Sequence, residues 1–252
     1  MNEQTSGIGW ISVTKLPSGY RTYPVGVEIK YRPYTFGEKK ELALGNKSEA
    51  EEIRFIMRGI EVNGMNKYDL TIPDYMYLAL MRKTSTDNEV KFTASFLCDA
   101  CGQNQILNFT VTDIKFKNLD VEGLPVRATL STGKVLEFKP MTVQGYLDMI
   151  REKPTDRTQV DFMARQVTNM KFPDAHKAIY DLSGSDEDLI DQVDKLLDFG
   201  ITPMEHKCDV CGFVNFVHVD LDKETLILPF RKSGPPDGSG ISYGDEGKHP
   251  AY

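Results

Sequence analysis

The alternation of apolar and polar residues divides the chain into helical and strand-like segments. Apolar side chains spaced three and four residues apart predict a helix, and apolar side chains at every second residue predict a strand. Both patterns recur along the chain, so the sequence predicts a mixed α+β protein. Helices are expected at about residues 36–44, 48–60, 71–81, 143–151, 158–170, 174–182 and 186–199, and strands at about residues 20–23, 25–31, 90–96, 106–114, 126–130, 135–138 and 213–221.

Capping signals predict where several of these helices begin and end. Thr35 and Ser48 are each followed three residues later by glutamate, the capping-box pattern in which side chains and backbone amides bond each other reciprocally. Pro73 lies where the first turn of the third helix is expected, a position that tolerates proline. For the last helix we expect Ser185 as the N-cap and Gly200 as the C-cap.

The same order of elements occurs twice along the chain. Arg32-Pro33-Tyr34-Thr35 follows one strand-like stretch, and Lys139-Pro140-Met141-Thr142 follows a predicted hairpin in the second half. Each is followed by helices, a strand, a CxxCG motif and a further strand, at spacings that agree within three residues. We interpret this as an internal duplication; the alternative is a chance likeness of two amphipathic halves. The predicted units are an arm at residues 1–15, a first repeat at 16–120, a second repeat at 121–230 and a tail at 231–252.

The chain has only four cysteines, and they form two CxxCG motifs, Cys98 with Cys101 and Cys208 with Cys211. Two thiolates separated by two residues can face one point, and a tetrahedral metal takes four such ligands. The glycine after each second cysteine lets the backbone curl around the sulfur. The pattern therefore predicts one structural Zn²⁺ bound by all four cysteines, with one pair from each repeat, in a zinc-ribbon-like site.

The cysteine pattern also allows other interpretations. Tetrahedral sulfur ligands suit iron as well as zinc. A CxxC pair can be a redox dithiol or a disulfide, although here each pair lies between strand-like runs. The thiols can also be reduced and without a ligand role. His206 is a further candidate ligand, but a plain strand residue is the simpler interpretation because four thiolates are already present.

Composition and charge narrow the classes of function. The net charge of −7 argues against a non-specific nucleic-acid binder, which normally has a basic face. No stretch approaches 18 consecutive apolar residues, and residues 1–10 lack the basic and apolar regions of a secretory signal. Cysteines in metal spacing without such a signal point to a reducing cytoplasm. We therefore expect no membrane partner and no nucleic-acid partner.

The composition changes after residue 230. Residues 231–252 are rich in glycine, proline and serine and contain few apolar side chains. Such a segment cannot build a packed core by itself. We expect this tail to become ordered only when a partner holds it.

The sequence contains no recognisable catalytic or cofactor-binding motif. The four histidines show no HExxH arrangement, and there is neither a GxGxxG nor a GxxxxGK[ST] motif. The acidic cluster that begins at Asp186 lies at a helix start, where carboxylates interact favourably with the helix dipole. We interpret that cluster as a solvated helix face rather than a metal site. The sequence thus predicts neither enzyme activity nor a small-molecule substrate.

Several motifs along the chain form one assembled pattern: Leu16-Pro17-Ser18-Gly19, Arg32-Pro33-Tyr34-Thr35-Phe36, Asp74-x-x-Tyr77-Leu78 before Met81-Arg82-Lys83, the two CxxCG motifs and Lys139-Pro140-x-Thr142. This pattern resembles the baseplate protein family of T-even-type contractile-tailed bacteriophages, in its group of hub subunits and hub-assembly chaperones. This resemblance implies a non-enzymatic role in building or forming the central baseplate hub. It implies other phage baseplate and tail proteins as partners, and a location in the host cytoplasm during assembly or in the tail baseplate of the virion.

Two further classes of function are alternatives to the phage assignment. A zinc-ribbon protein that binds nucleic acid or acts in transcription would also have paired CxxC motifs, but the acidic balance of the chain disfavours it. A rubredoxin-like iron protein that carries electrons would also use four cysteines. Such a protein would absorb visible light through its sulfur-to-iron transitions.

Overall fold

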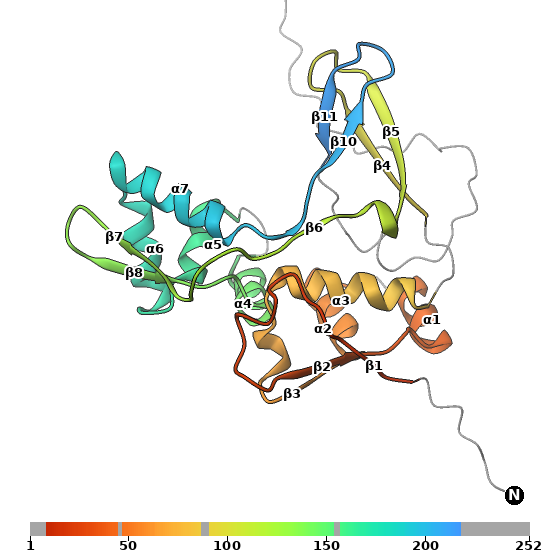
Figure 1. The fold of residues 1–252 in the computed structure, drawn as a ribbon, viewed down its shortest axis with the longest axis horizontal. Helices are drawn as coiled ribbons and strands as arrows, with labels where there is room; N and C mark the ends of the chain where they lie inside the picture. Colours follow the sequence, from red (N-terminus) through yellow and green to blue (C-terminus); the bar gives the residue numbers. More distant parts are fainter. Residues whose placement is uncertain (1–8, 45–46, 87–90, 154–156, 218–252) are drawn as a thin grey trace, which may run out of the picture.

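The computed structural model describes residues 9–44, 47–86, 91–153 and 157–217, and Figure 1 shows their arrangement. The expected tail at 231–252 and residues 1–8 of the expected arm lie outside the described residues. The elements form an N-terminal body, a second helical body and a pair of β-hairpins that project from them. The N-terminal body contains β1 (Ile11–Ser12), β2 (Glu28–Tyr31), β3 (Ile60–Asn63), α1 (Phe36–Leu44), α2 (Glu49–Met57), a 3-10 turn η1 (Lys67–Asp69) and α3 (Ile72–Thr84).

The second body, like the N-terminal body, combines a few short strands with helices. Its strands β7 (Val126–Thr129) and β8 (Val135–Phe138) form an antiparallel hairpin. Four helices follow this hairpin along the chain, and Figure 1 shows α5, α6 and α7 beside β7 and β8, with α4 between them and the N-terminal body. They are α4 (Val143–Glu152), α5 (Gln159–Gln166), α6 (Phe172–Tyr180) and α7 (Ser185–Leu197).

The two projecting hairpins come from distant parts of the chain but lie side by side (Figure 1). One consists of β4 (Lys91–Leu97) and β5 (Asn104–Thr110), which is followed by a 3-10 turn η2 (Val111–Asp113). The other consists of β10 (Met204–Lys207) and β11 (Val214–Val217). Below them β6 (Phe116–Lys117) pairs with β9 (Gly200–Ile201), so the segments that leave and enter the hairpins are joined.

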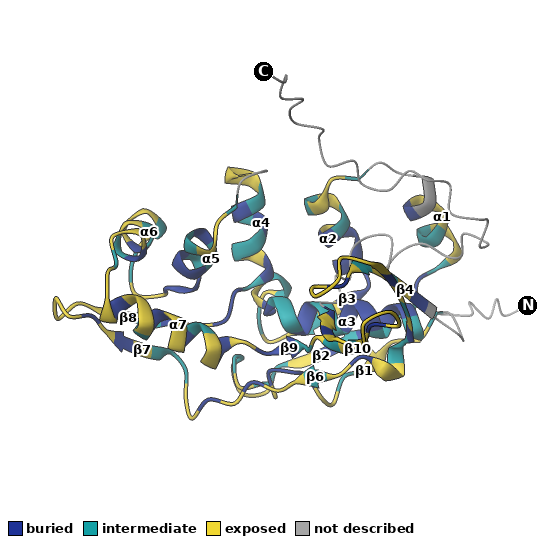
Figure 2. Cartoon of the chain, turned by 90° about the horizontal axis from the view of Figure 1, so that it is seen from above, coloured by how far each residue is buried: buried dark blue, intermediate teal, exposed yellow. Residues whose placement is uncertain are grey.

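Two hydrophobic cores correspond to the two bodies. One gathers apolar side chains of β2, β3 and α1–α3 together with Phe92 and Phe109 from the base of the β4–β5 hairpin, and the other gathers those of β7, β8 and α5–α7. Helix α4 connects the bodies, because its Val143 and Leu147 are buried in the first core. Figure 2 shows α3 as buried or intermediate along its whole length and α5 as mostly so.

Helix starts follow the capping signals closely. Helix α1 begins and ends where the sequence predicts, and the Thr35 hydroxyl accepts a hydrogen bond from the Glu38 amide at 3.0 Å while Glu38 accepts one from the Thr35 amide at 2.8 Å. Ser48 and Glu51 form the second predicted capping box. The prediction for α7 was wrong by one position, because Gly184 occupies the N-cap and Ser185 is the first helical residue.

Several boundaries differ from the predictions for local reasons. Residues 20–23 form turns instead of a strand, with the Tyr23 amide bonded to the Tyr20 carbonyl and Tyr20 at a φ of 62°. Helix α2 stops before Ile60, which starts β3 and pairs with Tyr31. Gly200, expected as a C-cap, lies in β9 instead.

The other differences concern where further elements begin and end. The strand expected at 106–114 ends at Thr110, where the chain enters η2. The helix expected at 158–170 ends at Gln166, because Val167 forms a β-bridge with Phe138. Ile11 and Ser12 of the expected irregular arm pair with β2. Residues 218–221 of the last expected strand lie outside the described residues.

Equivalent backbone contacts occur in the two bodies. In the first, Tyr31 pairs with Ile60, and the Arg32 amide donates to the Gly59 carbonyl at 3.0 Å. In the second, Phe138 pairs with Val167, and the Lys139 amide donates to the Gln166 carbonyl at 2.9 Å. Each residue of the second set lies the same number of positions after its counterpart in the first. In both bodies the two paired segments are separated by two helices.

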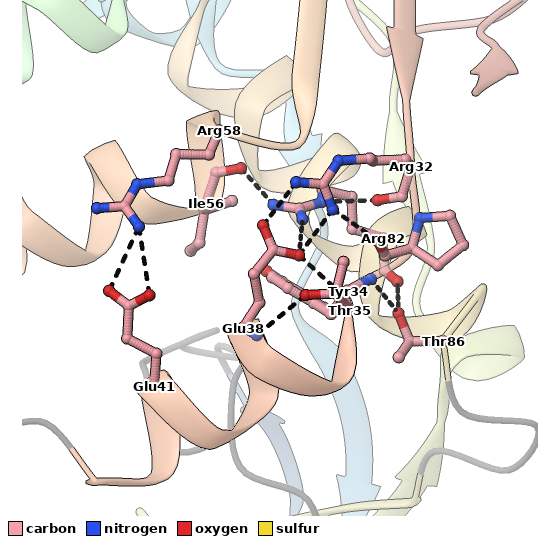
Figure 3. Close-up of polar contacts among 10 residues, drawn as sticks. Arg32, Tyr34, Thr35, Glu38, Glu41, Ile56, Arg58, Arg82 and Thr86 are labelled. Atoms are coloured by element: carbon pink, nitrogen blue, oxygen red, sulfur yellow. Dashed lines mark hydrogen bonds and ion pairs between the residues drawn. The ribbon is translucent and has the colours of Figure 1, made fainter. Parts of the chain in front are cut away.

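A buried arginine ties the helices of the N-terminal body together (Figure 3). Arg82 of α3 has no exposed side-chain surface, and its guanidinium lies 4.0 Å from the centre of the Tyr34 ring. It donates to the Arg32 carbonyl at 2.8 Å and to the Ile56 carbonyl, and it faces Glu38 at 3.6 Å. Glu38 also accepts two 2.7 Å hydrogen bonds from Arg32. The buried charge is therefore paired with Glu38, and two of its three nitrogens, Nε and Nη1, donate hydrogen bonds, which offsets part of the cost of burial.

Candidate metal centre

Each projecting hairpin carries one CxxCG motif in the loop between its strands. The last strand pairs define where each loop begins and ends: Leu97 pairs with Asn104 in the first hairpin, and Lys207 pairs with Val214 in the second. Both loops point away from the helical bodies (Figure 1). The strand, CxxCG, strand order predicted from the sequence is therefore present in both halves.

The two loops fold in the same way. In the first, the Cys98 amide donates to the Gln103 carbonyl at 2.9 Å, and the Gly102 amide donates to the Cys98 carbonyl at 2.8 Å. The equivalent bonds close the second loop around Cys208, at 2.8 and 2.9 Å. We call these two loops the first and second knuckle. Each knuckle is therefore closed by backbone bonds within its own loop.

The glycine of each CxxCG motif has the backbone conformation that the knuckle needs. Gly102 has a φ of 66° and Gly212 a φ of 77°, both in the left-handed region. Residues with a side chain rarely adopt this region, whereas glycine does so at little cost. The glycine in the motif is thus a consequence of the turn, as the sequence predicts.

The four predicted cysteines meet at one point. Their sulfur atoms all lie within 4.8 Å of one another. The Sγ atoms of Cys98 and Cys211 are 3.7 Å apart, as are those of Cys101 and Cys208. Sulfurs of a disulfide lie about 2.05 Å apart, so the four cysteines are free thiols in this arrangement. The short contacts join one knuckle to the other.

The sulfur spacing fits a tetrahedral metal. A Zn–S bond of about 2.3 Å places the corners of a regular tetrahedron about 3.8 Å apart. The 3.7 Å separations across the knuckles match that value. The donor set, four thiols and no oxygen or nitrogen, is the one that soft tetrahedral sites use. In the described part of the chain, no other group of histidine, cysteine and acidic side chains is arranged to hold a metal ion.

Burial and hydrogen bonding give the thiols unequal acidity. Loss of solvation acts to raise the pKa of Cys98, but hydrogen bonds from the Cys101 and Ala100 amides and from Asn215 lower it to about 6. At Cys101 a bond from the Gln103 amide lowers the pKa, but loss of solvation and the neighbouring thiols outweigh it and raise the pKa to about 12. The Cys98 thiol thus ionises more readily than an ordinary cysteine, and the Cys101 thiol ionises less readily. Full ionisation of four adjacent thiols needs a cation among them.

Two buried amide side chains cross between the knuckles. The Asp99 amide in the first knuckle donates to Asn215 Oδ1 of β11 at 3.0 Å. The Asp209 amide in the second donates to Gln105 Oε1 of β5 at 3.1 Å. Gln105 and Asn215 are 6% and 2% exposed. These bonds and the sulfur contacts are reciprocal, because each hairpin both offers an amide acceptor to the other and receives one from it.

The sequence alone did not single out Gln105 and Asn215. Each stands four residues after the second cysteine of its motif, so an extended pattern, CDxCGxx followed by Gln or Asn, marks both positions. The signal was available in the repeat, but nothing local indicates that the side chain reaches the opposite knuckle. That contact becomes visible only when the two hairpins are placed together.

The other candidate residues lie outside the cysteine cluster. His206 of β10 packs against Phe96 with ring centres 5.4 Å apart, which places it in the strand-residue role preferred from the sequence. Asp186 differs from the expected solvated residue, because it is buried and accepts hydrogen bonds from the Ser131 amide and hydroxyl at 2.8 and 2.7 Å. It therefore ties α7 to the turn of the β7–β8 hairpin.

Comparison with protein families gives a match to part of the chain. Residues 10–125 match the model of a protein family described as T4 bacteriophage base plate protein. The matched segment is somewhat less than half of the 252-residue chain and includes the first knuckle but not the second. No curated protein and no solved structure matches the chain significantly. Among the described helices, none has both the length and the apolar character needed to cross a membrane. The family match supports a bacteriophage baseplate protein without distinguishing a hub subunit from a hub-assembly chaperone.

Proposed function

We propose that this chain is a structural or assembly protein of the baseplate hub in a contractile phage tail, and that one structural zinc ion joins its two halves. The observation that carries the phage assignment is the family match over residues 10–125. The resemblance of the first helix start, Arg32-Pro33-Tyr34-Thr35, falls within that matched segment. Its partners are then other baseplate and tail proteins, which it meets in the host cytoplasm during assembly.

We also propose that the two halves arose by duplication. The equivalent strand pairings of Tyr31 with Ile60 and of Phe138 with Val167 support this, because they recur at one fixed sequence offset. The matched knuckles and their reciprocal amide bonds support it independently. In this proposal, residues 16–120 and 121–230 are the two repeats, and the metal lies on the pseudo-two-fold axis between them.

The metal prediction concerns the purified protein. We expect one zinc ion per chain, bound by Cys98, Cys101, Cys208 and Cys211, because the sulfur spacing fits a tetrahedral site. Metal analysis by mass spectrometry, together with titration of accessible thiols, measures this directly. A colourless protein with one zinc and protected thiols agrees with the proposal, visible sulfur-to-iron absorption indicates iron instead, and a metal-free protein with four reactive thiols contradicts it.

The baseplate role is tested by deleting the gene in the phage that encodes this chain. We expect lysates with tail tubes or heads but without complete baseplates, because a missing hub component or chaperone blocks hub formation. Supplying the wild-type chain from a plasmid should restore infectious particles. Complete and infectious particles in the deletion strain would contradict a baseplate role.

The same strains separate the two forms of the hub proposal. Mass spectrometry of purified virions detects the chain if it is a hub component and does not detect it if it acts only as an assembly chaperone. A control with a known tail-tube protein shows that the particles are intact. Salt-dependent DNA binding by the purified chain, with normal baseplates in the deletion strain, would support the alternative of a zinc-ribbon nucleic-acid-binding protein.

A further inference from the structure

The side chains of Gln105 and Asn215 are unusual for their burial and for the length of chain that they bridge. Buried amide groups are costly unless they are hydrogen-bonded. Gln105 Oε1 accepts from the Asp209 amide at 3.1 Å, and Asn215 Oδ1 accepts from the Asp99 amide at 3.0 Å. Both acceptors therefore face a backbone amide of the opposite hairpin, next to its first cysteine.

The amide nitrogens of both side chains also bind carbonyl groups of their own hairpins. Asn215 Nδ2 lies 3.4 Å from the carbonyls of both His206 and Phe213. Phe213 is the residue whose carbonyl closes the second knuckle by accepting from the Cys208 amide. Gln105 Nε2 donates to the Asn104 carbonyl at 3.0 Å. Each side chain is thus anchored at its own hairpin and holds the knuckle of the other.

We propose that Gln105 and Asn215 are positioning residues that hold the two knuckles in register and thereby slow the loss of the metal. This inference rests on the proposed zinc site and adds residues to it that are not ligands. Partners behind the first ligands of a metal site fix ligand orientation, and their removal typically weakens metal affinity about 10- to 100-fold. Here the partners fix the backbone at Asp99 and Asp209, and through it the direction of Cys98 and Cys208.

The test uses variants that keep the volume of each side chain but remove the acceptor oxygen, Gln105→Met and Asn215→Leu. Zinc transfer from the purified full-length chain to an excess of a coloured chelator gives the release rate. We expect release to be faster by about 10-fold or more in each variant. The Co²⁺-loaded variants should keep the absorption bands of four sulfur ligands, because the ligands themselves are unchanged.

Asn108→Leu is the matched control. Asn108 lies on the same strand as Gln105, is exposed, and its side-chain oxygen accepts a 2.9 Å hydrogen bond from Thr93 within its own hairpin. It should release zinc at the wild-type rate. Urea unfolding of all variants in parallel shows whether faster release reflects loss of the whole fold or loosening of the site alone.

The outcomes separate this inference from the proposed function. A wild-type chain without zinc defeats the proposed metal site itself. Zinc in the wild type, with release from Gln105→Met and Asn215→Leu no faster than from Asn108→Leu, defeats only the positioning role. If the two apolar variants do not fold, Gln105→Asn replaces them: it keeps the amide but is too short to reach Asp209, so we expect faster release, and a wild-type rate would overturn the inference.

Discussion

Replacing Cys208 by serine is expected to abolish tight zinc binding and to loosen both hairpins, not only the one that carries the change. The reason is that the sulfurs of Cys98, Cys101 and Cys211 share one site with Cys208, and the knuckles contact each other there. Structural zinc contributes about 10–16 kcal/mol of apparent binding free energy in small peptides. Loss of even about 3 kcal/mol would lower the Tm of a chain of this size by roughly 6–12 °C.

Metal analysis, thermal unfolding and hydrogen exchange measure this effect. Exchange of the amides of β4 and β5 should accelerate in Cys208→Ser although the substitution lies in the other hairpin. Val210→Ser is the control, since Val210 lies in the same knuckle and is 68% exposed. Faster exchange confined to β10 and β11, or a melting transition like that of the wild type, would show that the two halves do not share a metal.

Gly59→Ala is expected to destabilise the N-terminal body by at least about 3 kcal/mol. A Cβ atom at Gly59 would lie 2.0 Å from the Arg82 Cζ atom and 2.1 Å from its Nη2 atom. The guanidinium cannot simply move aside, because it bonds the Arg32 carbonyl and faces Glu38 in a buried position (Figure 3). Displacing it leaves buried charged and polar groups unpaired, which costs more than the methyl group gains.

Urea unfolding at neutral pH measures the change in the free energy of unfolding. Gly123→Ala is the matched control, because nothing lies within 4 Å of a Cβ at Gly123 and its φ is not in the left-handed region. We expect that control to stay within about 0.5 kcal/mol of the wild type. If Gly59→Ala is as stable as Gly123→Ala, the Arg82 cluster does not hold the helices as described.

Local signals in the sequence predicted the features that depend on local chemistry. Thr35 with Glu38 gave the start of α1 because a capping box is formed within four residues. The β7–β8 hairpin followed from alternation and a turn containing Gly133. The four cysteines could be assigned to one cluster because their spacing reflects the geometry of a knuckle rather than the rest of the fold.

Features that depend on distant contacts were not predictable in this way. Strands β6 and β9 have two residues each, too few to show alternation, and they exist because the two hairpins are brought together. A charged side chain such as that of Arg82 is usually exposed to solvent. Arg82 is buried instead, at the centre of a cluster with Arg32 and Glu38. Gln105 and Asn215 act across the interface between the hairpins.

The separation of the two knuckles along the chain also sets when the metal centre can close during synthesis. Cys101 and Cys208 are 107 positions apart. At a translation rate of about 5–20 residues per second, the first pair of thiols leaves the ribosome roughly 5–20 s before the second. During that interval the nascent chain presents half of a metal site. A neighbouring nascent chain on the same messenger RNA carries the same half-site, so correct pairing within one chain depends on the second body folding before two such chains meet.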